Sequence, residues 1–185
     1  LGLPVFVKPA RAGSSLGIVK VAHPDALREA IESARKHDPR IIVEAGVEGA
    51  REIECGVLVD ATGTPRASRC AEIIVNARHE FYDFEAKYLD DSATLVVPAD
   101  LPPEVEERVR DLAVRAFDAL DCDGLARADF FVRSDGTVVI NEVNTMPGFT
   151  SISLFPRMWE ATGVSYRNLV DRLVSDALRK GTGLH

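Results

Sequence analysis

Apolar residues follow two different spacings along this chain, and these spacings predict its secondary structure. Short apolar or alternating runs, typical of β-strands, occupy residues 5–7, 18–21, 40–44, 51–60, 65–75 and the two arms of segment 125–144. Apolar residues three and four positions apart, which indicate helices, occupy residues 24–36, 102–120, 154–162 and 166–180. This mixture of strands and helices predicts an α+β fold.

The segment 125–144 carries the most informative pattern. Asp-Gly at 135–136 lies between two apolar runs, where a two-residue hairpin loop needs positive φ angles. With that loop, Glu142 faces Asp129 across the hairpin and Asn144 faces Arg127. Because side chains alternate along a strand, we expect all four to share one face.

This shared face predicts a metal site. Two carboxylates directly opposite each other repel, and a divalent cation between them would remove the repulsion. Oxygen ligands suit Mg²⁺, so Asp129, Glu142 and Asn144 are the predicted ligands, with Arg127 as a cationic neighbour. A solvated acidic face is the alternative. The apolar remainder of both arms, and the Pro147-Gly148 that follows, favour the metal site.

Two loops are candidates for ligand contact. Residues 10–17 (Ala-Arg-Ala-Gly-Ser-Ser-Leu-Gly) join two strands and could form a flap whose N–H groups cradle phosphate oxygens, although an ordinary hairpin turn remains an alternative. Residues 76–93 fit no regular structure and gather aromatic and acidic residues around Lys87. An ordered loop of this kind is typical of a functional lid, with a surface ion pair as the other interpretation of Lys87.

Composition narrows the class of protein. The net charge of −7 argues against a general nucleic-acid partner. No apolar run has the length of a membrane span and no signal peptide is visible, so we expect a cytoplasmic protein without a membrane partner. Three cysteines without CxxC spacing are expected to be reduced core residues. Leu1 leads directly into a strand without a Met, and we therefore expect a piece of a longer chain.

Four blocks occur in an order that is known from one protein family. They are Val-Lys-Pro-Ala-Arg-Ala-Gly-Ser-Ser-Leu-Gly at 7–17, Val-Glu-Ala-Gly-Val followed by Arg-Glu-Ile-Glu-Cys within 43–55, Tyr-Asp-Phe-Glu-Ala-Lys-Tyr at 82–88, and segment 124–150 from Gly-Leu-Ala-Arg-Ala-Asp to Pro-Gly-Phe-Thr. In this order the chain resembles the ATP-grasp superfamily, and within it the D-alanine–D-alanine ligases.

The resemblance implies an ATP-grasp fold, with antiparallel β-sheets and flanking helices. Residues 1–46 would end the central subdomain and 47–185 would form the C-terminal subdomain, with its lid at 76–93. The family's N-terminal substrate domain, which contributes a Glu, and a further nucleotide lysine are absent from this sequence. The implied reaction joins two D-alanines through an acyl phosphate for peptidoglycan synthesis, using ATP and two Mg²⁺ ions that Mn²⁺ can replace. The resemblance also suggests a homodimer.

The family's site residues carry over to positions of this sequence. Those expected to bind ATP are Lys8, Ser15, Glu44, Ala45, Val47 and Glu52. Those expected to bind substrate are Arg127, Gly148, Ser153 and Leu154, of which the last three would hold the second D-alanine. Those expected to act in catalysis are Lys87, Arg127 and the hydrogen-bonded pair Ser14 and Tyr88. The metal ligands are again Asp129, Glu142 and Asn144.

Tyr88 bears on substrate choice. D-alanine–D-lactate ligases carry a His in that role, and a neutral tyrosine hydroxyl does not repel an incoming amine, so this sequence favours dipeptide synthesis. A D-lactate-using relative and another carboxylate–amine ligase remain alternatives. From other classes, the alternatives are a non-catalytic nucleotide-binding fragment and a solvated domain without a ligand.

Overall fold

The computed structural model describes residues 1–13, 15–75 and 93–180. The chain divides into two compact units, one containing Leu1–Glu48 with Val75–Thr94 and the other Gly49–Ile74 with Leu95–His185. Within the described ranges, no helix combines the length and apolar character needed to cross a bilayer. The predicted α+β class is confirmed, since antiparallel sheets and helices make up both units.

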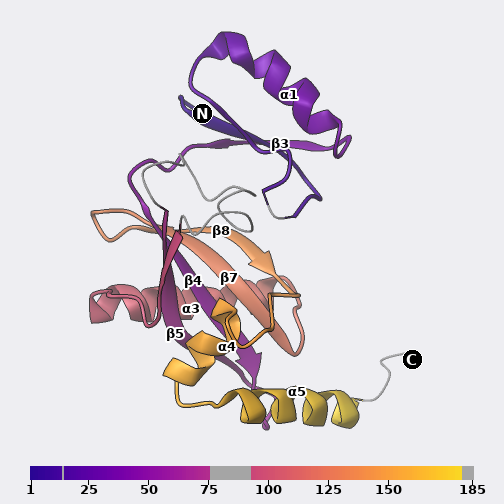
Figure 1. Cartoon of the computed structure of the whole chain (residues 1–185), viewed down its shortest axis with the longest axis vertical. Coiled ribbons are helices and arrows are strands. Elements are labelled where there is room, and N and C mark those ends of the chain that lie inside the picture. Colours follow the sequence, from indigo (N-terminus) through magenta and orange to yellow (C-terminus); the bar gives the residue numbers. More distant parts are fainter. Residues whose placement is uncertain (14, 76–92, 181–185) are drawn as a thin grey trace. The chain divides into compact units, whose positions relative to one another are not determined.

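The first unit is a three-stranded antiparallel sheet covered on one face by a helix (Figure 1). Its elements are β1 (Val5–Pro9), β2 (Val19–Val21), the short 3-10 turn η1 (Pro24–Ala26), α1 (Leu27–Arg35) and β3 (Ile41–Ala45), with strand order β2-β1-β3. Val5 and Val7 pack with Ala30 and Ala34 of the helix. Because side chains alternate, Lys8 lies on the opposite, helix-free face of the sheet.

The second unit is organised around a five-stranded antiparallel sheet. Its elements are β4 (Arg51–Val59), β5 (Pro65–Val75), β6 (Ala93–Val96), α3 (Pro103–Ala119), β7 (Leu125–Val132), β8 (Val138–Asn144), α4 (Leu154–Ala161) and α5 (Tyr166–Lys180). The strand order is β6-β5-β4-β7-β8, so β4 and β7 lie side by side in the interior of the sheet.

Helices cover this sheet on both faces, but not over its whole area. On one face, α3 packs against alternate residues of β4 and β7 in a core that includes Ile53, Cys55, Val109, Ala113 and Phe130. On the other face, helices α4 and α5 form a smaller core that includes Leu58, Phe155, Trp159 and Leu169. This second core occupies the Leu58 end of β4. The other end of the same face carries the polar residues described below.

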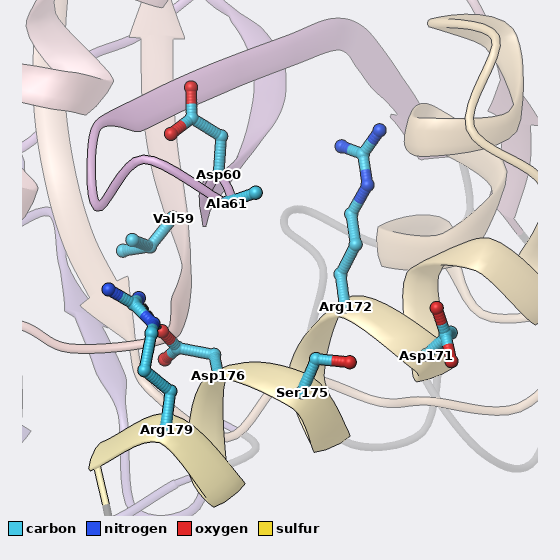
Figure 2. Close-up of a pocket in the computed structure, with 8 residues that line it drawn as sticks. All are labelled: Val59, Asp60, Ala61, Asp171, Arg172, Ser175, Asp176 and Arg179. Atoms are coloured by element: carbon cyan, nitrogen blue, oxygen red, sulfur yellow. Dashed lines mark hydrogen bonds and ion pairs between the residues drawn. The ribbon is translucent and has the colours of Figure 1, made fainter.

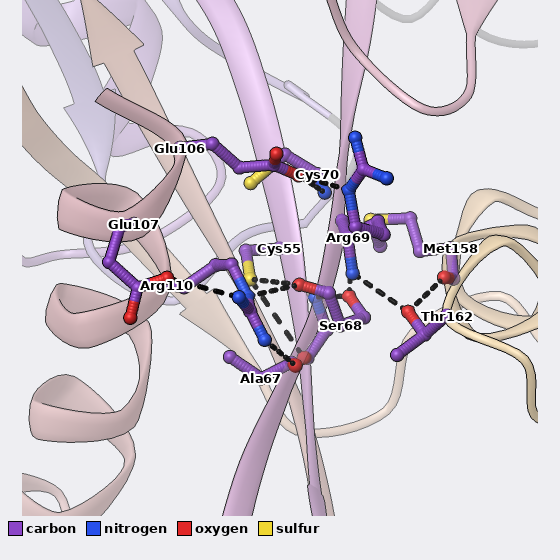
Figure 3. A network of polar contacts seen from close by, with 11 residues as sticks. Cys55, Ala67, Ser68, Arg69, Cys70, Glu106, Glu107, Arg110, Met158 and Thr162 are labelled. Atoms are coloured by element: carbon purple, nitrogen blue, oxygen red, sulfur yellow. Dashed lines mark hydrogen bonds and ion pairs between the residues drawn. The ribbon is translucent and has the colours of Figure 1, made fainter. Parts of the chain in front are cut away.

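One irregularity lies where β4 pairs with β5. The register shifts between Cys55 and Val57, because β5 contains one extra residue. Figure 3 shows that side chains provide main-chain partners there: Arg110 of α3 donates to the Ser68 carbonyl at 3.1 Å and the Ala67 carbonyl at 3.2 Å. The Gly56 N–H donates to the Ser68 hydroxyl at 2.9 Å. Three main-chain groups at the bulge thus have side-chain partners.

Most elements begin and end within two residues of the predicted bounds, and β6 is a strand that the sequence did not predict. The predicted lid, 76–93, lies outside the described residues except for Ala93, which begins this strand. The predicted burial of cysteines is confirmed for Cys55 and Cys70, while Cys122 is half-buried. The assignment of 1–46 and 47–185 to two ATP-grasp subdomains stays a prediction.

Candidate functional site

Three carboxylates form a row across adjacent strands of the second unit. Glu54 of β4 pairs in register with Asp129 of β7, and Asp129 pairs in turn with Glu142 of β8. The Asp129–Glu142 pairing was predicted, and it is confirmed. In the next row Arg127 pairs with Asn144, also as predicted. These residues lie on the sheet face opposite the α3 core, because Ala126, Ala128 and Phe130 point into that core.

The predicted two-residue hairpin loop, by contrast, is wrong. The Arg133 N–H donates to the Thr137 carbonyl at 2.9 Å, which leaves a three-residue loop at 134–136. Gly136, with φ of 80°, provides the left-handed position of this loop. Val132 therefore faces Val138, and one extra residue of β8, Asn141, restores the predicted register from Glu142 onward.

Arg127 is held by the acidic row. Its Nε and Nη2 donate to the two oxygens of Asp129, each at 2.7 Å, and its Nε lies 3.3 Å from Glu54 Oε2. Burial alone would lower the pKa of Arg127, but the hydrogen bonds that it donates to Asp129 and the charges of Asp129, Glu54 and Glu142 raise it above its ordinary value. The guanidinium is a permanent positive charge on this face.

The predicted metal ligands fit a hard cation by their chemistry. Asp129 and Glu142 are directly opposite each other, and Asn144 lies two residues from Glu142 on the same face, which gives an all-oxygen donor set. The Asn144 side-chain oxygen accepts the Met146 N–H at 2.9 Å, and an amide oxygen has a second lone pair for an ion. Among the described residues, no three His, Cys, Asp or Glu side chains converge as a metal cluster. The set is thus two carboxylates and an amide.

The predicted substrate residues Gly148, Ser153 and Leu154 follow β8 in the chain. Ser153 precedes the first residue of α4, Leu154, and the Ser153 hydroxyl accepts the Thr150 N–H at 3.1 Å. A Cβ at Gly148 would come within 3.0 Å of that hydroxyl, so only glycine fits without a shift. Ser153 is therefore hydrogen-bonded to Thr150 and lies close to Gly148 within the segment between β8 and α4.

The predicted ATP-binding residues divide between the two units. In the first, Lys8 Nζ lies 2.7 Å from Glu44 Oε2 on the helix-free sheet face, and Ala45 ends β3 just before Val47. Ser15 has a positive φ of 58° within the predicted flap. In the second unit, Glu52 pairs with Phe131 and shares the face of Glu54.

Three predicted catalytic residues, Ser14, Lys87 and Tyr88, lie outside the described residues. Their assigned roles stay predictions. Glu54, in contrast, was given no role from the sequence although it lies in the acidic row. A signal was present, because a charged residue at that position interrupts an otherwise buried strand.

A pocket of about 290 Å³ lies elsewhere in the second unit, between the β4–β5 turn and α5. Figure 2 shows Asp60, Arg172, Asp176 and Arg179 around it. The Arg179 guanidinium donates to Asp176. Asp60 accepts from Arg66 at 3.0 Å. The pocket contains none of the predicted site residues, and its Asp60, Asp176 and Arg179 each have an ion-pair partner within the protein.

Comparisons with known proteins show which family this chain is similar to. A family model described as "D-ala D-ala ligase C-terminus" matches residues 1–175. The D-alanine–D-alanine ligase of Nocardia farcinica is 62% identical over 100% of this chain and 51% of its own length. The ligase of Streptomyces coelicolor is 61% identical over 99% of this chain and 46% of its own length.

Two solved structures are also similar. The VanG D-Ala:D-Ser ligase of Enterococcus faecalis has a TM-score of 0.83 and 40% identity, covering 95% of this chain and 50% of that chain. The D-alanine–D-alanine ligase of Coxiella burnetii has a TM-score of 0.81 and 36% identity, covering 95% and 45%. This likeness confirms the predicted ATP-grasp fold. The chain spans about half the length of the curated relatives it matches. It belongs to the D-alanine–D-alanine ligase family, whose C-terminal region it matches.

Proposed function

We propose that this chain supplies the C-terminal, ATP- and metal-binding part of a ligase that joins two D-alanines for peptidoglycan synthesis. The observation that carries the proposal is the placement of Asp129, Glu142, Asn144 and Arg127 on one face of the sheet. The curated relatives at about 60% identity are named for this activity. D-serine as the second substrate is the competing function, because one solved relative is a D-Ala:D-Ser ligase.

The family resemblance assigns ATP-binding roles to six residues. Lys8 and Ser15 would contact phosphate oxygens, Glu44 with the main chain of Ala45 and Val47 would hold adenine, and Glu52 would hold the ribose. The Lys8–Glu44 ion pair at 2.7 Å supports part of this assignment, since it fixes a lysine on the open sheet face next to a carboxylate acceptor.

Asp129, Glu142 and Asn144 would hold Mg²⁺, and we propose two ions, with Mn²⁺ able to replace them. The bound ions would supply charge neutralisation at the phosphate oxygens of ATP. Arg127 would stabilise negative charge on the phosphoryl group during transfer and then on the tetrahedral adduct. A half-buried, permanently charged guanidinium suits this role, because it needs no reorganisation as charge develops.

The reaction would run in two steps. A carboxylate oxygen of the first D-alanine attacks the γ-phosphorus of ATP, giving an acyl phosphate and ADP. The amine of the second D-alanine then attacks the acyl carbon, and phosphate leaves with the bonding electron pair. Gly148, Ser153 and Leu154 would hold this second substrate. Lys87, Ser14 and Tyr88 would assist from the lid and the flap.

The test is product analysis with the gene product that contains this chain. Incubated with ATP, Mg²⁺ and D-alanine, it should release phosphate and form D-alanyl-D-alanine, with little product when D-lactate or D-serine is the second substrate. The double variant Asp129→Asn/Glu142→Gln should retain its fold and lose Mg²⁺-dependent nucleotide binding. A folded gene product that never binds the nucleotide would contradict the proposal.

Two further expectations follow from the family. The 185-residue chain alone should not make the dipeptide, and phosphate release at the rate of an intact ligase would contradict this. The gene product should be a cytoplasmic homodimer, which light scattering after size exclusion and cell fractionation would check.

A further inference from the structure

We infer that Glu54 is a positioning residue, which keeps Arg127 in place on the site face when Asp129 takes up the metal ion. The inference rests on the proposed function and extends it to a residue that none of the predicted roles uses. Glu54 has 5% of its surface exposed, and it lies on β4 directly opposite Asp129.

The geometry places Arg127 between two carboxylates. On β4, Gly56 pairs with Arg127 and Glu54 pairs with Asp129, so Glu54 is the diagonal neighbour of Arg127. The Arg127 Nε is 2.7 Å from Asp129 Oδ1 and 3.3 Å from Glu54 Oε2. One donor group thus has two acidic partners within the distance of an ion pair.

Charge then decides what happens when a cation binds. Asp129 carries one negative charge, and an ion bound to it would weaken its attraction for Arg127. Glu54 retains its own charge and continues to attract the guanidinium. If Glu54 compensates the positive charge of Arg127, two carboxylates remain for a divalent ion. These are Asp129 and Glu142, and together they offer it two negative charges. Without Glu54, Arg127 and the ion would compete for Asp129.

We do not propose Glu54 as a metal ligand. The described residues contain no converging group of three acidic, His or Cys side chains, although Glu54, Asp129 and Glu142 occupy one row. The Arg127 guanidinium instead lies within ion-pair distance of both Glu54 and Asp129. Glu54 therefore influences the metal through Arg127.

The experiment compares matched variants of the gene product that contains this chain. Glu54→Gln removes the charge and keeps the shape. Glu72→Gln is the control, because Glu72 is also a buried carboxylate paired with an arginine, with its Oε2 2.6 Å from Arg51 Nη2. Glu72 pairs with Ile53, whose side chain lies in the α3 core, so it faces away from the acidic row. Both variants lose one charge and one ion pair.

The readout is Mg²⁺ binding by titration calorimetry in the presence of a saturating, non-hydrolysable ATP analogue. Glu54→Gln should weaken Mg²⁺ binding about tenfold, as expected for the loss of one nearby charge, while Glu72→Gln leaves it unchanged. Glu54→Asp, which restores the charge, should recover most of the affinity. If Glu54→Gln does not fold, Glu54→Ala takes its place in the comparison. Folded Glu54→Ala should then bind Mg²⁺ more weakly than folded Glu54→Asp.

The outcomes separate the inference from the function it rests on. Equal Mg²⁺ affinity in Glu54→Gln and Glu72→Gln, or a Glu54→Asp variant no better than the uncharged ones, overturns the role of Glu54 alone. A native protein that binds neither Mg²⁺ nor the nucleotide analogue overturns the proposed function.

Discussion

The Arg127 guanidinium and the Asp129 carboxylate, two residues apart on β7, are joined by two hydrogen bonds of 2.7 Å. The side chains share a face because strand residues alternate, and the planar fork of arginine matches the two carboxylate oxygens. The cationic group of the site is thus held by one of its predicted metal ligands. Substitutions of either residue should therefore affect metal binding and catalysis together.

Replacing Arg127 with Lys should lower kcat about 100-fold with little change in thermal stability. Lysine keeps the charge but lacks the fork that bonds both Asp129 oxygens. Steady-state phosphate release measures the effect. Arg133→Lys, at an exposed position beside the hairpin loop, is the control and should keep native kcat. Equal rates for the two variants would remove Arg127 from the mechanism.

Replacing Asp129 with Asn should abolish Mg²⁺-dependent nucleotide binding, with a loss of affinity of at least about 100-fold. The amide keeps one acceptor oxygen but loses the charge that attracts the ion. Calorimetric titration of Mg²⁺ with a nucleotide analogue measures this. Asp135→Asn provides the matched control, since Asp135 is exposed in the loop of the same hairpin and accepts the Thr137 N–H at 2.8 Å. Native affinity in Asp129→Asn would refute the metal assignment.

Asp38 should make the stability of the first unit depend on pH. Hydrogen bonds from Arg11 and from the Arg40 N–H lower the pKa of Asp38 to about 2, from an ordinary value of 3.8. A lowered folded-state pKa gives stability that is present above 3.8 and is lost as the pH falls through about 2. The difference in thermal midpoint between native protein and Asp38→Asn should therefore shrink across that window.

The control for this pH experiment is Asp111→Asn, which removes an exposed carboxylate 3.6 Å from Arg115 on α3. Its midpoint should differ little from native at each pH. A difference between native and Asp38→Asn that stays constant from neutral pH to about 2 would show that Asp38 does not titrate as described.

Replacing Gly56 with Ala should destabilise the second unit by about 1–3 kcal/mol, the usual cost of overpacking. The added Cβ would come within 3.0 Å of ring atoms of both Phe155 and Trp159. Urea denaturation measures the free energy of unfolding. Gly13→Ala is the control, because its Cβ would meet nothing within 4 Å. Equal stabilities would mean that α4 yields easily where it crosses β4.

The hairpin shows how a correct site can follow from an incorrect loop. Asp-Gly favours both two-residue and three-residue loops, and the sequence alone does not separate them. A regular two-residue hairpin would place Asn141 opposite Phe130, on the face that packs against α3. The three-residue loop instead places Ile140 opposite Phe130. Asn141 is then the extra residue of β8, so its polar side chain is not placed opposite a core residue. The wrong loop length and the missed bulge shift the register by one residue in opposite directions. Asp129 therefore still faces Glu142, as predicted.

Other features could not be obtained from spacing alone. The position of Glu54 beside Arg127 depends on which strand neighbours β7, and strand order is a tertiary property. The strand β6 has only four residues, too few for a periodic signal. The long helices, in contrast, were predicted nearly to the residue, because their apolar stripes extend over several turns.

The bulge at Asn141 has a second effect, on association between molecules. Within the described residues, β8 ends the order of its sheet, so its outer main-chain groups have no neighbouring strand there. A straight, regular edge strand can pair with a strand of another molecule, and a bulge twists the edge away from such pairing. Deleting Asn141 would leave Glu142 opposite Asp129 but make this ribbon regular, so we expect a variant that still binds Mg²⁺ yet aggregates readily.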